Sequence, residues 1–155
     1  MFDNTDWRKL LLCIVITQSA GVIGSIFTIP AIPTWYESLN RTPINPPDWL
    51  FAPMWTTLYL LMGVSLYLIL GKKNNKIGLT LFYIQLGLNA LWSVLFFGLK
   101  SITAGVIEIV FLWFFVLFTI IEFRQLDKRA AYLLIPYIAW VTIATILNLA
   151  ISFYN

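Results

Sequence analysis

Residues 35–59 read WYESLNRTPINPPDWLFAPMWTTLY. This stretch gathers three Trp, two Tyr and four Pro, and it then continues into an apolar segment. Trp and Tyr are enriched where membrane spans meet the water interface, and Pro favours extended or turn backbone. We therefore interpret the stretch as either an anchor belt at a membrane surface or the lid and wall of a binding site.

The composition of the chain is that of a membrane protein. Of its 155 residues, 60% are hydrophobic and 11% are charged, and its mean hydropathy is +0.84. A soluble domain of this size needs far more charged side chains to cover its surface. The sequence therefore predicts an integral membrane protein in which almost every residue lies in a span or a brief connection.

Five apolar segments are long enough to cross a bilayer, which takes about 20 helical residues. They predict an all-α bundle of five transmembrane helices that forms a single membrane domain over residues 1–155. The connection at 30–48 begins with Pro30 and is rich in Pro, and we interpret it as a lid, with a plain connector as the alternative. The predicted helices are 9–29, 49–70, 77–99, 102–123 and 130–153.

The basic residues predict the orientation of the chain. When the five spans are threaded in order, eight Lys and Arg lie on the side of the N-terminus and two on the opposite side. Since cytoplasmic connections carry the excess of Lys and Arg, we expect the N-terminus in the cytoplasm and the first loop and C-terminus outside. Short clusters of this kind do not suggest nucleic-acid binding. The eight are Arg8, Lys9, Lys72, Lys73, Lys76, Arg124, Lys128 and Arg129, and the two are Arg41 and Lys100.

The residues of common enzyme and metal sites are missing from the sequence. There is no His, and the single Cys, Cys13, lies in the first apolar segment, where we interpret it as a small apolar filler. No Gly-rich phosphate loop, CxxC pair or carboxylate pair at workable spacing is present. The sequence therefore predicts no metal site and no ordinary catalytic centre.

Polar and aromatic residues form stripes on three of the predicted helices. Because polar side chains in hydrocarbon are costly, such stripes face the interior of a bundle. They either join helices through amide hydrogen bonds or line a shared cavity suited to a large, flat, mostly apolar ligand. The stripes are Trp55, Tyr59 and Met62; Gln85, Asn89, Trp92 and Phe96; and Tyr137, Trp140, Ala144 and Asn148.

Two other residues inside the predicted spans carry an expectation of their own. We interpret Glu108 as a buried carboxyl that bonds across helices or reaches toward the membrane surface, with a proton-coupled role as the alternative. Pro136 is expected to kink the fifth span or to start its regular part.

Several motifs, in order along nearly the whole chain, resemble the TspO/translocator-protein family, also called tryptophan-rich sensory proteins or peripheral-type benzodiazepine receptors. Each motif alone is weak, whereas their combination in this order is specific. The motifs are WY-x-x-L-x-R at 35–41, PP at 46–47, F-x-P-x-W-x-x-L-Y-x-x-M-G at 51–63, Q-x-x-L-N-x-x-W-S-x-x-F-F-G at 85–98, L-L-I-P-Y-x-x-W-V at 133–141 and A-x-x-L-N at 144–148.

The resemblance implies a homodimer of five-helix bundles that binds tetrapyrroles, notably protoporphyrin IX, in a pocket roofed by the first loop. Animal members of the family also bind cholesterol and synthetic ligands, and some bacterial members promote light-dependent degradation of the bound porphyrin. Position by position, the family's pocket residues fall on Tyr36, Trp55, Asn89, Trp140 and Ala144.

This sequence departs from the family pattern at two places. The family loop often reads KPxWxPP, whereas this chain has Thr42 at the first Pro and Ile44 at the Trp, which predicts weaker or differently selective lid contacts. The family's cholesterol motif needs Lys or Arg after an aromatic residue near the C-terminus, and none follows Tyr154. We therefore expect no specific cholesterol site.

The stripes and the resemblance together predict a membrane receptor or sensor whose tetrapyrrole, or other flat apolar ligand, packs among Trp and Tyr faces. We expect Asn89 to bond a polar edge of the ligand and Arg41 to pair with a propionate. No cofactor is required, and a porphyrin is the expected ligand. Two alternatives stay open, a light-dependent porphyrin-degrading enzyme with Trp55 or Trp140 as redox partner and a porphyrin transporter. The predicted ligand-binding residues are Tyr36, Arg41, Trp55, Tyr59, Asn89, Trp92, Tyr137, Trp140, Ala144 and Asn148.

Overall fold

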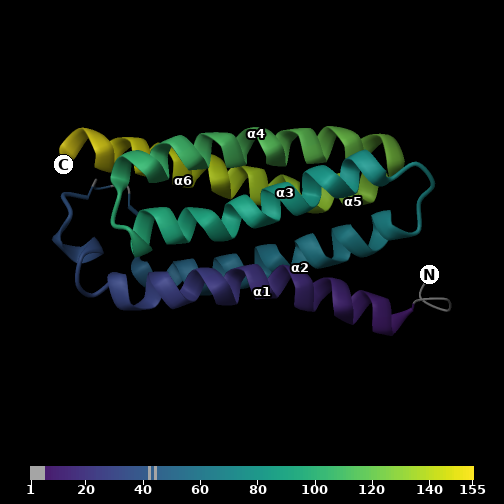
Figure 1. Cartoon of the computed structure of the whole chain (residues 1–155), viewed down its shortest axis with the longest axis horizontal. Helices are drawn as coiled ribbons and strands as arrows, with labels where there is room; N and C mark the ends of the chain where they lie inside the picture. Colours follow the sequence, from purple (N-terminus) through teal and green to yellow (C-terminus); the bar gives the residue numbers. More distant parts are fainter. Residues whose placement is uncertain (1–5, 42, 44) are drawn as a thin grey trace.

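The computed structural model describes residues 6–41, 43 and 45–155, and the regular secondary structure of these residues is entirely helical (Figure 1). The departures noted at Thr42 and Ile44 lie outside the described residues. The helices are α1 (Trp7–Ala31), α2 (Phe51–Leu70), α3 (Lys76–Ser93), α4 (Ile102–Leu126), α5 (Lys128–Leu133) and α6 (Ile135–Tyr154), with the 3-10 turns η1 (Tyr36–Ser38) and η2 (Asp48–Leu50) and the π-helical turn η3 (Val94–Gly98).

Five helical stretches are long and apolar enough to cross a membrane, which confirms the predicted fold class. Each of them contains or nearly coincides with one predicted helix, and their ends differ from the prediction by a few residues. The five stretches are Trp7–Ala31, Asp48–Leu70, Lys76–Gly98, Ile102–Leu126 and Lys128–Tyr154.

The first helix is longer than predicted. The sequence predicts Pro30 in the loop, whereas the structure places it inside α1, one residue before the helix ends. The prediction is wrong because Pro lacks only its own N–H and crowds only the turn before it, so it can occupy the last turn of a helix that stops one residue later. The Thr34 hydroxyl donates a hydrogen bond of 3.0 Å to the Pro30 carbonyl, which has no donor of its own at the helix end.

The fifth span consists of two helices in series. The first, α5, ends at Leu133, and Pro136 stands in the first turn of α6, where its missing N–H is not needed. This confirms the expectation that Pro136 starts the regular part of the span.

The helices form a bundle in which α1 packs against α2 and α3, α4 packs against α3 and α6, and α2 packs against α5. Figure 1 shows the C-terminus and the α1–α2 connection at one end of the bundle and the N-terminus at the other. Hydrogen bonds between Asn40 and Asn155 join the connection to the C-terminus. Which end faces the cytoplasm stays a prediction.

Small residues bring α1 and α2 close together in the half of the bundle near the N-terminus. A Cβ at Gly63 would lie 2.7 Å from the Cα of Ile14, so the contact requires glycine. The Thr17 hydroxyl donates a hydrogen bond of 2.7 Å to the Tyr59 carbonyl and fixes the two helices in register.

The helices α2 and α6, in contrast, have few close backbone approaches. Large aromatic side chains span the distance between them. The ring centroids of Phe51 and Trp140 are 5.9 Å apart, and those of Trp55 and Tyr137 are 6.3 Å apart. Bulky rings at this interface hold the two helices apart and leave room for a cavity beside them.

Glu108, on α4, is buried in the bundle, with 5% of its surface exposed. Neither of its carboxylate oxygens has a hydrogen-bond partner among the described residues. Its burial therefore agrees with the prediction, whereas the structure contains neither the expected bond across helices nor a side chain that reaches the surface.

Candidate ligand-binding cavity

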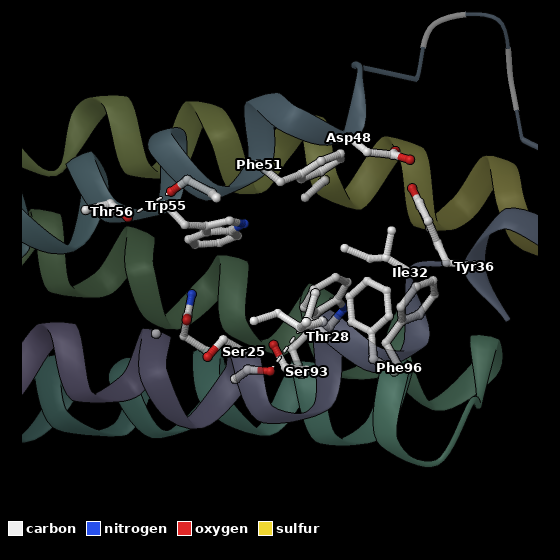
Figure 2. Close-up of a pocket in the computed structure, with 18 of the residues that line it drawn as sticks. Ser25, Thr28, Ile32, Tyr36, Asp48, Phe51, Trp55, Thr56, Ser93 and Phe96 are labelled. Atoms are coloured by element: carbon white, nitrogen blue, oxygen red, sulfur yellow. Dashed lines mark hydrogen bonds between the residues drawn. The ribbon is translucent and has the colours of Figure 1, made fainter. Parts of the chain in front are cut away.

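A cavity of about 370 Å³ lies in the half of the bundle near the C-terminus, with walls from α1, α2, α3, η3 and α6. Figure 2 shows Phe51 and Trp55 on the α2 side, Phe96 across from them, and Tyr36 with Asp48 at one end. This volume is within the range of small-molecule sites. The aromatic residues that line it are Tyr36, Phe51, Trp55, Tyr59, Trp92, Phe96, Phe97 and Trp140.

One wall combines aromatic rings of α2 and α6. The ring of Trp55 stacks on Tyr59 with a centroid distance of 5.7 Å and an interplanar angle of 27°. Phe51 lies on α2 about one helical turn before Trp55, and its ring meets that of Trp140 edge to face. The wall therefore presents indole and phenyl faces to a bound molecule, the geometry that favours flat aromatic ligands.

The opposite wall comes from α3 and the π-helical turn that ends it. Trp92 stacks on Phe96 at a centroid distance of 5.1 Å with the rings 11° from parallel. Phe97 meets Phe96 edge to face at 5.0 Å, and both are buried. In a regular α-helix two consecutive residues point about 100° apart, and the wider η3 turn brings both rings to the cavity.

A hydrogen-bonded chain closes the inner end of the cavity. The Tyr59 hydroxyl donates to Asn89 Oδ1, and Asn89 Nδ2 donates to the Tyr137 hydroxyl at 3.0 Å. The chain ties α2, α3 and α6 together. It uses the amide oxygen and one of the two N–H donors of Asn89, so one amide hydrogen remains for a ligand.

Three polar atoms of the cavity residues are buried and have no hydrogen-bond partner among the described residues. They are Trp92 Nε1, Trp140 Nε1 and Asn148 Oδ1. A buried polar atom without a partner costs about 1–3 kcal/mol. Two donors and one acceptor of the cavity residues are thus without a partner among the described residues.

The end of the cavity beside the α1–α2 connection, here called the outer mouth whichever side of the membrane it faces, carries a pair of opposite charges. Arg41 Nη1 lies 2.9 Å from Asp48 Oδ1, and the Arg41 guanidinium lies 5.0 Å from the ring centroid of Tyr36. Asn45 Nδ2 donates a hydrogen bond of 3.0 Å to the Tyr36 hydroxyl. Among the described residues that line the cavity, Asp48 is the only charged one.

The cavity also opens sideways between α1 and α2. Its lining includes Val22 and Ile29 of α1 and Ala52 and Thr56 of α2, all of which are exposed on the bundle surface. The Gln18 amide donates to the Thr56 carbonyl at 3.0 Å and marks the inner end of this opening. In a bilayer the opening faces lipid.

The structure places most of the predicted binding residues around this one cavity. Arg41 and Tyr137 are the two that do not line it. The Arg41 side chain is paired with Asp48, and the buried Tyr137 ring lies behind Trp55, where it anchors Asn89. Their predicted contact with a ligand stays a prediction. The residues that line the cavity are Tyr36, Trp55, Tyr59, Asn89, Trp92, Trp140, Ala144 and Asn148.

Sequence reasoning missed the contribution of α1 and of two rings, Phe51 and Phe97. A signal for α1 was present, since small and polar residues recur on one face of an otherwise apolar helix. Phe97 carried no such signal, because a regular helix directs it away from Phe96. The missed small and polar residues of α1 are Gln18, Gly21, Gly24, Ser25 and Thr28.

Comparisons with known proteins agree with this architecture. The model of the TspO/MBR family matches residues 13–154. The "Tryptophan-rich protein TspO" of Chlorobaculum tepidum is 44% identical over 156 residues, which cover 98% of this chain and 99% of the relative. The protein of the same name from Archaeoglobus fulgidus is 41% identical, with 95% and 97% covered, and the "Translocator protein" of Ovis aries is 40% identical, with 92% and 87% covered.

These matches extend over all five membrane-spanning stretches, so the likeness concerns the whole bundle and not a single motif. Together with the five spans they establish a multi-pass integral membrane protein. On both grounds, the chain belongs to the TspO/MBR family.

Proposed function

We propose that this protein is a membrane receptor or sensor that binds a tetrapyrrole of the protoporphyrin IX type in the cavity. The observation that carries the proposal is the pair of facing aromatic walls, Phe51 and Trp55 on one side and Trp92 and Phe96 on the other. Flat macrocycles gain most from such walls, because both of their faces are covered by rings. Membership of the family supports the same class of ligand.

The polar atoms of the cavity supply the means to orient a macrocycle. The two indole N–H groups of Trp92 and Trp140 and the remaining amide hydrogen of Asn89 are donors that polar edge atoms can accept from. Arg41 is the candidate partner for a ligand carboxylate, and it would have to leave Asp48 to serve as one. The lateral opening between α1 and α2 supplies a path for an apolar ligand from the bilayer.

A titration in the dark tests the proposal. Purified protein in detergent is titrated with protoporphyrin IX and with its dimethyl ester, and quenching of Trp fluorescence is followed. We expect saturable quenching, and Trp140→Phe and Asn89→Ala are expected to weaken binding about tenfold through lost ring contact and a lost polar partner. Trp113→Phe is the matched control, because Trp113 donates to Thr142 and does not line the cavity.

Absence of saturable quenching by either compound in folded protein would contradict the proposal. Cys13 supplies the test of folding, because it is the single cysteine and is buried, so a maleimide dye labels it only after unfolding. Illumination of the complex and flux into proteoliposomes then separate a receptor from the two alternatives. Products that form under light indicate a porphyrin-degrading enzyme, and directional flux indicates a transporter.

Three further expectations concern the assembly and its surroundings. We expect a homodimer, which light scattering of the purified protein measures after the detergent is subtracted. We expect no specific cholesterol site, as the sequence predicts. We also expect a cytoplasmic N-terminus, which accessibility of a reporter fused to either end determines.

A further inference from the structure

Asp48 has an unusual position for a cavity that is otherwise apolar. It begins η2, lines the outer mouth, and is the one charged residue among the described residues of the lining. Figure 2 shows its carboxylate at the same end of the cavity as the Tyr36 hydroxyl. Its side chain is 34% exposed, so water screens the charge only in part.

The partner of Asp48 is the cation that an acidic ligand would need. Arg41 does not line the cavity, and its Nη1 is held 2.9 Å from Asp48 Oδ1. A ligand carboxylate at the mouth therefore meets a neutral ion pair. It must displace Asp48 from Arg41, and the displaced carboxylate then lies close to the incoming one. A ligand with an uncharged edge meets neither obstacle.

We propose that Asp48 sets the charge preference of this site, so that a tetrapyrrole with an uncharged edge at the mouth is preferred over the corresponding dicarboxylic acid. The inference rests on the proposed function, since it concerns which tetrapyrrole the cavity takes. Arg41 acts through Asp48: while the pair is intact, the guanidinium is not available to the ligand.

The test compares protoporphyrin IX with its dimethyl ester in four proteins, the wild type, Asp48→Asn, Arg41→Gln and the double variant. Acid and ester partition differently into detergent, so the readout is the change in their affinity ratio between variants, from which partitioning cancels. Glu37→Gln is the matched control, because it removes one exposed acidic charge from the same loop without touching the cavity.

We expect Asp48→Asn to strengthen binding of the acid by about 5- to 10-fold by removing a repulsion and freeing Arg41, and to change the ester by less than about 2-fold. Arg41→Gln should weaken the acid, because it leaves Asp48 unpaired at the mouth. The double variant should return the acid close to its wild-type affinity, and Glu37→Gln should leave the ratio unchanged.

Three outcomes would overturn the inference. If Asp48→Asn weakens acid and ester equally, Asp48 only holds the loop closed. If the affinity ratio does not move while both compounds bind, Asp48 has no part in selection and the proposed function still stands. If neither compound binds to any of the four folded proteins, the proposed function fails and this inference fails with it.

Discussion

Asn40 and Asn155 stand 115 positions apart in the sequence and exchange two hydrogen bonds. The backbone N–H of Asn40 donates to Asn155 Oδ1 at 3.0 Å, and Asn155 Nδ2 donates to the Asn40 carbonyl at 3.2 Å. The side-chain amide of the last residue thus pairs with the loop backbone as a neighbouring strand would. The α1–α2 connection, which contributes Tyr36 and Asp48 to the cavity lining, is therefore fastened to the end of α6.

Replacing Asn155 by Ala should loosen this loop without unfolding the bundle. The change leaves a backbone N–H and a carbonyl without their partners, and each hydrogen bond contributes about 0.5–1.5 kcal/mol. We expect faster amide hydrogen exchange in the loop and faster dissociation of any bound porphyrin. Tyr154→Ala is the control, because the hydrogen bond from Asn40 Nδ2 goes to the backbone carbonyl of Tyr154, which this change keeps. Equal exchange rates in wild type and Asn155→Ala would show that the fastening contributes nothing.

The chain of Tyr59, Asn89 and Tyr137 predicts a separation of stability from binding. Tyr137→Phe removes one hydrogen bond behind the cavity wall, so it should reduce stability by about 1 kcal/mol and leave porphyrin affinity within about twofold. Asn89→Ala removes the central partner of both hydroxyls and a cavity contact, so it should reduce both quantities. Stability is measured from the temperature at which a maleimide dye labels Cys13. Loss of affinity in Tyr137→Phe equal to that in Asn89→Ala would argue against this division.

The close approach of α1 to α2 predicts that one methyl group added at Gly63 lowers the stability of the fold. Gly63→Ala places a Cβ 2.7 Å from the Ile14 backbone, which cannot yield as a flexible side chain does. We expect a loss of about 1–3 kcal/mol, the usual range for overpacking. Gly87→Ala is the matched control, since nothing lies within 4 Å of its added Cβ. Dye labelling of Cys13, on the same face of α1 as Thr17, reports both variants, and equal unfolding temperatures would refute the packing argument.

Periodicity made much of this cavity predictable from the sequence. Asn89, Trp92 and Trp140 lie on helices, where a spacing of three or four residues fixes the shared face and where hydrocarbon forces polar groups inward. The same reasoning cannot say how deep along a stripe the cavity reaches. Tyr137 shares a stripe with Trp140 and yet lies behind the wall.

The remaining features depend on backbone that has no period. Arg41 and Asp48 both lie between α1 and α2, where no helical period relates one position to the other, so no spacing rule predicts their ion pair. Phe97 reaches the cavity because α3 ends in a π-helical turn, and Pro30 stays helical because α1 ends just after it. The last two departures lie at the ends of helices, where the pattern of hydrophobic residues is least informative.

The end of the bundle opposite the cavity predicts a loss of stability in acid. Asp127 lies between α4 and α5. Its carboxylate accepts a hydrogen bond from Arg129 and lies 2.8 Å from Lys72 Nζ. The hydrogen bond from Arg129, with a further contribution from Lys72, lowers the pKa of Asp127 below its usual value. The ionised carboxylate therefore stabilises the folded state fully above about pH 4, and this stabilisation is lost as the pH falls further.

Asp127→Asn keeps a helix-capping side chain and should reduce stability by about 1–2 kcal/mol at neutral pH. Near-UV circular dichroism of thermal unfolding at pH 7 and pH 3 should show a smaller acid effect in the variant. An unchanged difference between the two pH values would assign the acid sensitivity to other carboxylates.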